Sequence, residues 1–233
     1  MRTVGILIVG DEILKGEISD LNGPYVIQAL SRRGVEIVRL VVTPDDVEAI
    51  ATDLTRMRAL ADAVVLSGGI GPTHDDVTRP AVARVLGRPL VVHAEAARRI
   101  RGYYGDRVTD AEMSMASMPQ GARLVSGERT GTFGFEAAGV YALPGVPFLF
   151  RDLVDGLARD FDDMPLHREE VRTDRREGEL APHLAAVQGD TRGVMIGSYP
   201  VCEDGCWHVR VVVRGRDPVL VAACAQRIRT LSL

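Results

Sequence analysis

The sequence predicts an α/β protein: a doubly wound, mostly parallel sheet in residues 1–163, followed by a small α+β, ferredoxin-like domain in residues 164–233. Two observations lead to this prediction. In the first part, short apolar runs rich in β-branched residues alternate with segments of helical periodicity, which is typical of βαβ units. After Asp162-Asp163-Met164-Pro165 the pattern restarts as strand, helix, strand, strand and helix, the order of a split-βαβ domain.

Each element of the first part is supported by its own local pattern. Apolar runs predict strands, and apolar residues three or four positions apart predict helices. Gly34 is expected to stop the first long helix, and Thr78 to be the N-cap of a later one, with Pro80 in its first turn. The predicted strands are residues 3–9, 35–42, 63–66, 122–125, 133–137 and 140–143. The predicted helices are residues 21–33, 47–60, 79–86, 94–104, 110–118 and 148–161.

The second part is shorter, and the same criteria apply to it. The predicted strands are residues 168–173, 194–198 and 207–213, and the predicted helices are residues 177–188 and 219–231.

Composition restricts the classes of protein to consider. With 46% hydrophobic and 26% charged residues among 233, the chain is an ordinary globular protein without an apolar run long enough to cross a membrane. A net charge of −4 supplies no basic field for nucleic acid. The chain opens on a strand-like run instead of a signal peptide, and its three cysteines cannot all be paired, so we expect a cytoplasmic protein. We also expect a homo-oligomer.

One turn carries the strongest chemical signal. Residues 67–78, Ser-Gly-Gly-Ile-Gly-Pro-Thr-His-Asp-Asp-Val-Thr, join a predicted strand to a predicted helix. Glycines let backbone N–H groups approach a phosphate, and a helix N-terminus favours an anion. The turn lacks the Lys-Ser/Thr ending of a P-loop, and His74 replaces the last glycine of the dinucleotide fingerprint. Because Asp75 and Asp76 repel phosphate, a divalent cation is the natural mediator. A plain βα turn is the alternative.

Four segments follow strands at the same edge of the predicted sheet, where open parallel sheets bind ligands. They are Gly10-Asp11-Glu12-Ile13-Leu14-Lys15-Gly16, Thr43-Pro44-Asp45-Asp46, residues 68–76 and Pro144-Gly145-Val146-Pro147. Simpler functions exist for the single residues. Asp45 or Asp46 would cap the helix at Val47, Asn22 would cap the helix that follows it, and Asp11 and Glu12 would be solvated loop acids. Because acidic residues follow several strands at the same edge, a ligand-binding site is favoured over these separate functions.

Together these motifs resemble the competence/damage-inducible protein A (CinA) family, whose first domain is of the molybdopterin-binding, MoaB/Mog-like type. The resemblance covers about residues 1–160 and continues through Gly197-Ser198-Tyr199-Pro200, as in stand-alone relatives. The motifs that carry it are residues 10–16, Asn22, residues 68–78 and residues 144–147. The same domain is fused to flavin-nucleotide enzymes in eukaryotes. The C-terminal deamidase domain that many members carry is not expected in this chain, which ends at Leu233.

The resemblance implies a small-molecule nucleotide or pterin ligand over the glycine-rich turn. By motif position, Asp45 and Asp76 match two aspartates that serve metal binding and adenylyl transfer in the adenylyltransferase branch. Residues 125–135, around Thr130-Gly131-Thr132, depart from the family's usual form. The predicted ligand-binding residues are Gly10, Asp11, Glu12, Asn22, Gly68, Gly69, Gly71, Pro72, Thr73, Asp75, Thr78, Pro144 and Gly145.

Three functions follow. The first is metal-dependent hydrolysis of a nucleotide pyrophosphate such as ADP-ribose, the activity associated with the CinA branch. The N–H groups of Gly69, Gly71 and Thr73 would hold a phosphate, and Asp45 and Asp76 would bind Mg²⁺ or another divalent cation, with Asp11 or Glu12 as further candidates. The second is molybdopterin binding or adenylyl transfer in molybdenum cofactor biosynthesis. The third is nucleotide or pterin binding without turnover.

Overall fold

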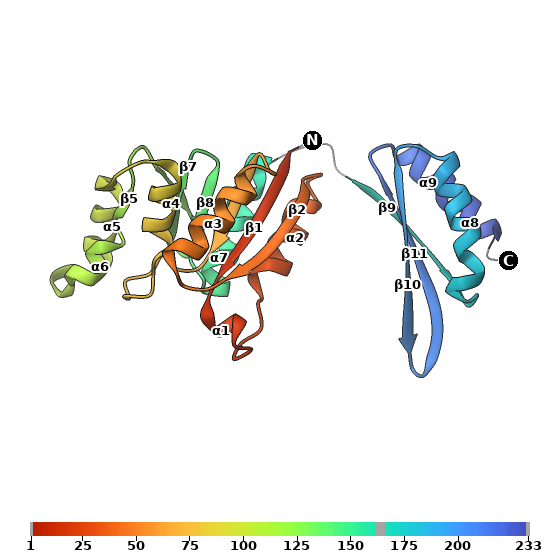
Figure 1. Ribbon diagram of the computed structural model, residues 1–233, viewed down its shortest axis with the longest axis horizontal. Helices are drawn as coiled ribbons and strands as arrows, with labels where there is room; N and C mark the ends of the chain where they lie inside the picture. Colours follow the sequence, from red (N-terminus) through yellow and green to blue (C-terminus); the bar gives the residue numbers. More distant parts are fainter. Residues whose placement is uncertain (1, 162–165, 232–233) are drawn as a thin grey trace. The chain divides into compact units, whose positions relative to one another are not determined.

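The computed structural model describes residues 2–161 and 166–231 and divides into two compact units, Met1–Asp163 and Met164–Leu233 (Figure 1). The predicted break at Asp162–Pro165 lies outside the described residues. The fold class is confirmed: a mostly parallel α/β sheet forms the first unit and a small α+β fold forms the second. No helix within 2–161 or 166–231 is both long and apolar enough to cross a bilayer.

The first unit is built on a six-stranded sheet of order β2-β1-β3-β8-β7-β6. The first four strands in this order run parallel, while β7 and β6 are antiparallel to their neighbours. The carboxyl ends of the four parallel strands therefore share one edge. The strands are β1 (Thr3–Val9), β2 (Glu36–Thr43), β3 (Ala63–Ser67), β8 (Val140–Leu143), β7 (Phe133–Ala137) and β6 (Arg123–Ser126).

Helices cover both faces of this sheet, which explains why β1 is buried and without polar side chains from Val4 to Val9. Leu7 belongs to the core beneath α3, α4 and α5, whereas Ile6 belongs to the core beneath α2 and α7. Both side chains are completely buried, and each such burial contributes about 2 kcal/mol. The helices of this unit are α1 (Asp11–Leu14), α2 (Asn22–Ser31), α3 (Val47–Arg58), α4 (Thr78–Leu86), α5 (Ala94–Tyr104), α6 (Asp110–Ser114), α7 (Pro147–Leu157) and the 3₁₀ turns Gly105–Arg107 and Ala158–Phe161.

The helix predicted for residues 110–118 is wrong in its second half. Helix α6 ends at Ser114, and β5 (Ser117–Pro119) pairs antiparallel with β4 (Leu90–Val92). Burial of Met118 in the core decides the conformation, because a strand places that side chain inward while Val91 pairs with its backbone. Helical periodicity alone could not show this partner strand.

The second unit has the predicted split-βαβ arrangement. Strand β11 lies between β9 and β10 and is antiparallel to both, while α8 and α9 supply Leu180 and Ile228 to the core beside Val211. Strand β10 is longer than predicted because its pairing with β11 continues to Glu203 opposite Cys206. The elements are β9 (His167–Thr173), α8 (Glu177–Asp190), β10 (Val194–Glu203), β11 (Cys206–Gly215) and α9 (Pro218–Leu231).

Candidate active site

A pocket of about 770 Å³ opens at the carboxyl ends of the parallel strands in the first unit. The loops after β1, β2, β3 and β8 all contribute to it, as the sheet topology predicts. Of the predicted site residues, Gly10, Glu12, Asp45, Gly68, Gly69, Gly71, Thr73, Asp75, Asp76, Pro144 and Gly145 line the pocket. Asp11, Asn22, Pro72 and Thr78 are not among its lining residues.

The glycine turn runs close against β1. Gly68 and Gly69 have φ angles of 103° and 67°, a region that side chains disfavour. A Cβ atom on Gly68 would lie 2.3 Å from the carbonyl oxygen of Val9. Thr78 fastens the turn from the helix side, donating its N–H to Gly69 O and its hydroxyl to Gly68 O.

The role predicted for Thr78 as an N-cap is therefore wrong. Helix α4 begins at Thr78 itself, and the hydroxyl donates to Gly68 O instead of accepting a helix N–H. Asn22 is likewise not a cap: it is buried, and its amide donates to Ser67 Oγ (2.8 Å) and Gly145 O (2.7 Å). Asp20 caps that helix, accepting from the N–H of Asn22. Asn22 thus links the end of β3 to the loop after β8 by hydrogen bonds.

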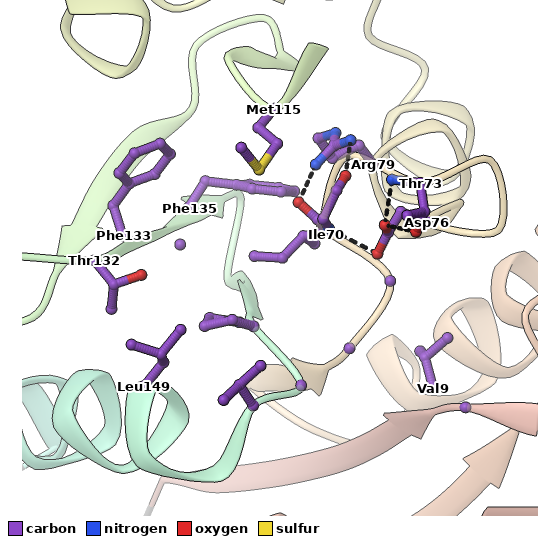
Figure 2. A pocket seen from close by; sticks show the side chains of 18 of the residues that line it. Val9, Ile70, Thr73, Asp76, Arg79, Met115, Thr132, Phe133, Phe135 and Leu149 are labelled. Atoms are coloured by element: carbon purple, nitrogen blue, oxygen red, sulfur yellow. Dashed lines mark hydrogen bonds between the residues drawn. The ribbon is translucent and has the colours of Figure 1, made fainter. Parts of the chain in front are cut away.

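The carboxylate of Asp76 lies inside the turn (Figure 2). It accepts the N–H groups of Gly71 (2.7 Å) and Thr73 (2.8 Å) and the hydroxyl of Thr73. Two of the three N–H groups predicted to hold a phosphate are thus engaged by Asp76. A phosphate in this position would have to replace the carboxylate.

Arg79 holds the other side of the turn, and sequence reasoning missed it. Its guanidinium donates to Ile70 O and to Gly71 O (2.7 Å), and the residue is only 6% exposed (Figure 2). Burial lowers the pKa of the guanidinium, against the opposing influence of Asp76. The signal was its position: a cation in the first turn of a helix opposes the helix dipole, so another interaction must hold it there.

Acidic side chains gather at one end of the pocket. Asp45 Oδ2 accepts the N–H of Asp11 (2.9 Å), and Asp11 pairs with Lys15 (2.9 Å). Burial raises the pKa of Asp45; the Asp11 N–H opposes this rise, and the carboxylates of Glu12, Asp11 and Asp75 add to it. Helix α3 is capped instead by the neighbouring residue, Asp46, which accepts the N–H of Ala49. Asp45 is therefore not a helix cap.

These carboxylates have the chemistry of a Mg²⁺ site but not a complete ligand set. Within the described residues, no group of three or more His, Cys, Asp or Glu side chains is arranged to hold a metal ion. Mg²⁺ usually binds through one or two carboxylates together with waters and substrate phosphates. Burial and the neighbouring carboxylates, which raise the pKa of Asp45, both disfavour its charge, and a cation would offset this. The residues thus fit a cation that binds together with a phosphate ligand.

Much of the remaining pocket lining is apolar or aromatic (Figure 2). Met115, Phe133 and Phe135 lie on one side of the glycine turn, and Leu149 of α7 completes this part. Such a surface accommodates a flat heteroaromatic ring. Sequence reasoning did not assign these side chains, because the residue after α6 comes together with β7 and α7 only in the fold.

Asp152 anchors the loop of residues 128–132, which supplies Thr130, Gly131 and Thr132 to the same wall. Its carboxylate accepts the N–H groups of Arg129 (3.1 Å) and Thr130 (2.8 Å) and the Thr130 hydroxyl (2.7 Å). Burial alone would raise the pKa of Asp152, but these hydrogen bonds outweigh it and hold the pKa well below its ordinary range.

The fold and the site together define a molybdopterin-binding-type protein. The family model described as "Probable molybdopterin binding domain" matches residues 5–163, and the model "FAD synthase, middle domain" matches residues 165–232. The chain belongs to the CinA-like proteins with a molybdopterin-binding-type domain, as the following relatives show.

A CinA-like protein of Syntrophus aciditrophicus is 34% identical over 84% of this chain and 50% of its own length. A second, from Citrifermentans bemidjiense, is 37% identical over 62% of this chain and 37% of its own length. This chain thus spans half or less of these two proteins. A protein of Archaeoglobus fulgidus is 31% identical over 97% of this chain and 96% of its own length.

A solved structure shares the first part of the fold. The protein CinA of Thermoplasma acidophilum, described as having unknown function, is 30% identical with a TM-score of 0.64. The match covers 69% of this chain and 98% of that protein.

Proposed function

We propose that the first unit hydrolyses a nucleotide pyrophosphate of the ADP-ribose class with the help of a divalent cation. The observation that carries the proposal is that three kinds of surface line one pocket. These are carboxylates, the glycine turn, and apolar and aromatic side chains. A dinucleotide or sugar nucleotide has matching parts: charged phosphates and a flat base.

The residues support charge neutralisation, which phosphoryl transfer needs more than a nucleophilic side chain. Asp45 and Asp76 stay the proposed cation ligands, with Glu12 beside them in the pocket lining. When bound, the cation would offset phosphate charge and lower the pKa of a coordinated water. The N–H groups of Gly71 and Thr73 would bind one phosphate once Asp76 has left them.

A second candidate is binding or adenylyl transfer of a pterin. The aromatic wall near Phe133 and Phe135 favours it, because it suits a pterin ring as well as a nucleobase. The description of the matching family model, a probable molybdopterin binding domain, also supports this candidate. A third candidate, binding without turnover, is supported by the incomplete ligand set of the acids in the described part of the chain.

The deciding experiment incubates the full chain with ADP-ribose and Mg²⁺, with EDTA as the control, and separates the products by chromatography. We expect AMP and ribose 5-phosphate with Mg²⁺ and intact ADP-ribose with EDTA. A parallel reaction with ATP and a pterin acceptor tests transfer, for which the expected product is an adenylated pterin. ADP-ribose that binds in calorimetry but stays intact in all reactions would contradict the hydrolase proposal and favour the binding protein. Light scattering of the same sample tests the expected homo-oligomer.

A further inference from the structure

Arg79 is a buried cation with an unusual set of partners. Its side chain donates to two backbone carbonyls, those of Ile70 and Gly71, instead of to a carboxylate. Asp76 is the carboxylate whose charge acts on this guanidinium. By contrast Arg99, the other arginine that lines the pocket, pairs with Glu95 at 2.8 Å. A buried guanidinium is costly unless an anion offsets its charge, so Arg79 and the anion inside the turn depend on each other.

The hydrogen bonds of the turn show where that anion belongs. Arg79 binds the carbonyl groups of residues 70 and 71, so its fork fixes the peptide planes of the turn. The N–H groups of Gly71 and Thr73 converge on one carboxylate, that of Asp76. The turn therefore already surrounds an anion, and a phosphate offers the same kind of acceptor with more charge.

We propose that Arg79 is a positioning residue that sets the glycine turn for a phosphate group, which takes the place of the Asp76 carboxylate. This inference rests on the proposed function, since it names the part of the substrate that the turn holds. The positive charge of the buried guanidinium stays balanced in this exchange, because the phosphate replaces another anion, the carboxylate of Asp76. The substrate class is then a phosphate ester or pyrophosphate, and a neutral nucleoside depends on the aromatic wall alone.

Calorimetry in EDTA tests the proposal with three probes: ADP-ribose, inorganic pyrophosphate and neutral adenosine. We expect Arg79→Met to weaken pyrophosphate and ADP-ribose binding about tenfold or more and to leave adenosine binding unchanged. Arg79→Lys keeps the charge but lacks the planar guanidinium. Its affinity for pyrophosphate and ADP-ribose should therefore lie between those of wild type and Arg79→Met. Arg84→Met, on the exposed side of the same helix, is the matched control and should bind like wild type.

The proposal is overturned if pyrophosphate binding is unchanged in both Arg79 variants, or if pyrophosphate and adenosine binding fall together. Arg79→Lys keeps the test valid if Arg79→Met does not fold. Asp76→Asn should retain or tighten pyrophosphate binding in EDTA, and weaker binding would overturn the exchange. If ADP-ribose binding depends on Arg79 but wild type never hydrolyses ADP-ribose, the hydrolase proposal is wrong and the inference about Arg79 stands. If wild type hydrolyses ADP-ribose but the Arg79 variants bind it as wild type does, the inference about Arg79 is wrong and the hydrolase proposal stands.

Discussion

The acidic end of the pocket and its glycine turn both place an aspartate at the carboxyl edge of the sheet, but the two carboxylates have opposite surroundings. Asp76 is surrounded by donors, two backbone N–H groups and a hydroxyl. Asp45 has one backbone donor, from Asp11, and its pKa is raised by burial and then by the neighbouring carboxylates. The same residue type thus organises a loop at one position and carries unbalanced charge at the other.

This difference shows that only one of the two acids is ready to bind a cation as it stands. A carboxylate that satisfies a turn contributes to the fold until a ligand replaces it, so Asp76 must first leave its donors. A carboxylate in a crowded acidic cluster contributes little to stability and gains most from a cation. The predictions follow in order of expected effect, and those at Asp45 and Asp152 test this division between carboxylates with few donors and carboxylates held by several.

The largest effect is expected at Asp45. Asp45→Asn keeps an acceptor for the Asp11 N–H but removes the charge, so kcat for Mg²⁺-dependent ADP-ribose hydrolysis should fall about a hundredfold or more. The melting temperature should not fall. Chromatographic product assays and thermal melts on the same samples measure both quantities.

The neighbouring Asp46 provides the matched control, since it caps helix α3. Asp46→Ala should cost about 1 kcal/mol of stability and leave kcat unchanged. If instead Asp45→Asn lowers the melting temperature and leaves turnover intact, Asp45 is a structural residue and the division is wrong.

The second effect tests the close approach of the glycine turn to β1. Gly68→Ala adds a Cβ atom 2.3 Å from Val9 O at a φ of 103°, and should destabilise the protein by about 3 kcal/mol. Gly87→Ala is the control, because Gly87 also has a positive φ but nothing within 4 Å of the added atom. It should cost only about 1 kcal/mol. Equal losses in urea unfolding would show that φ alone, and not contact with β1, requires Gly68.

The third effect concerns the aromatic end. Asp152→Asn should cost about 2 kcal/mol, because an amide group cannot accept all the donors from Arg129 and Thr130. Since the pKa of Asp152 is lowered on folding, this contribution is complete above its ordinary value of 3.8 and is lost as the pH falls below it. Asp155→Asn, 41% exposed in its side chain, is the control and should change urea unfolding by less than about 1 kcal/mol. If Asp152→Asn and Asp155→Asn lose the same free energy of unfolding at pH 7, Asp152 has no special role in stability.

The fold could be predicted largely from sequence because its signals are local. Apolar runs such as residues 3–9 and helix stops such as Gly34 fix elements without knowledge of their neighbours. The error at residues 110–118 arose where a partner decided the outcome: Val91 pairs with Met118 and converts the segment to a strand. Such pairings between distant residues leave little trace in local periodicity.

The site could be predicted only in its position. Sheet topology places Asp45 and the glycine turn at one edge, so their meeting in one pocket follows from the strand order. The partner of each carboxylate does not follow, since Asp76 and Asp45 look alike in sequence. Arg79 and Asp152 were missed because their roles are hydrogen bonds to loop backbone, which residue patterns do not encode.

The smallest effect, the pH dependence of stability at Asp45, tests whether burial and the neighbouring carboxylates disfavour its charge. Because folding raises the pKa of Asp45, its contribution is present below the ordinary value of 3.8 and is lost as the pH rises above it. In EDTA, Asp45→Asn should therefore become more stable relative to wild type as the pH rises from about 4 to 6, by less than about 1 kcal/mol. Asp62 gives the opposite case, since its hydrogen bonds from Thr3 lower its pKa, so wild type should lose its advantage over Asp62→Asn as the pH falls below 3.8. Urea unfolding across this range measures both differences. If both variants show the trend expected for Asp62, burial and the neighbouring carboxylates do not raise the pKa of Asp45, and its charge is not one that a cation must offset.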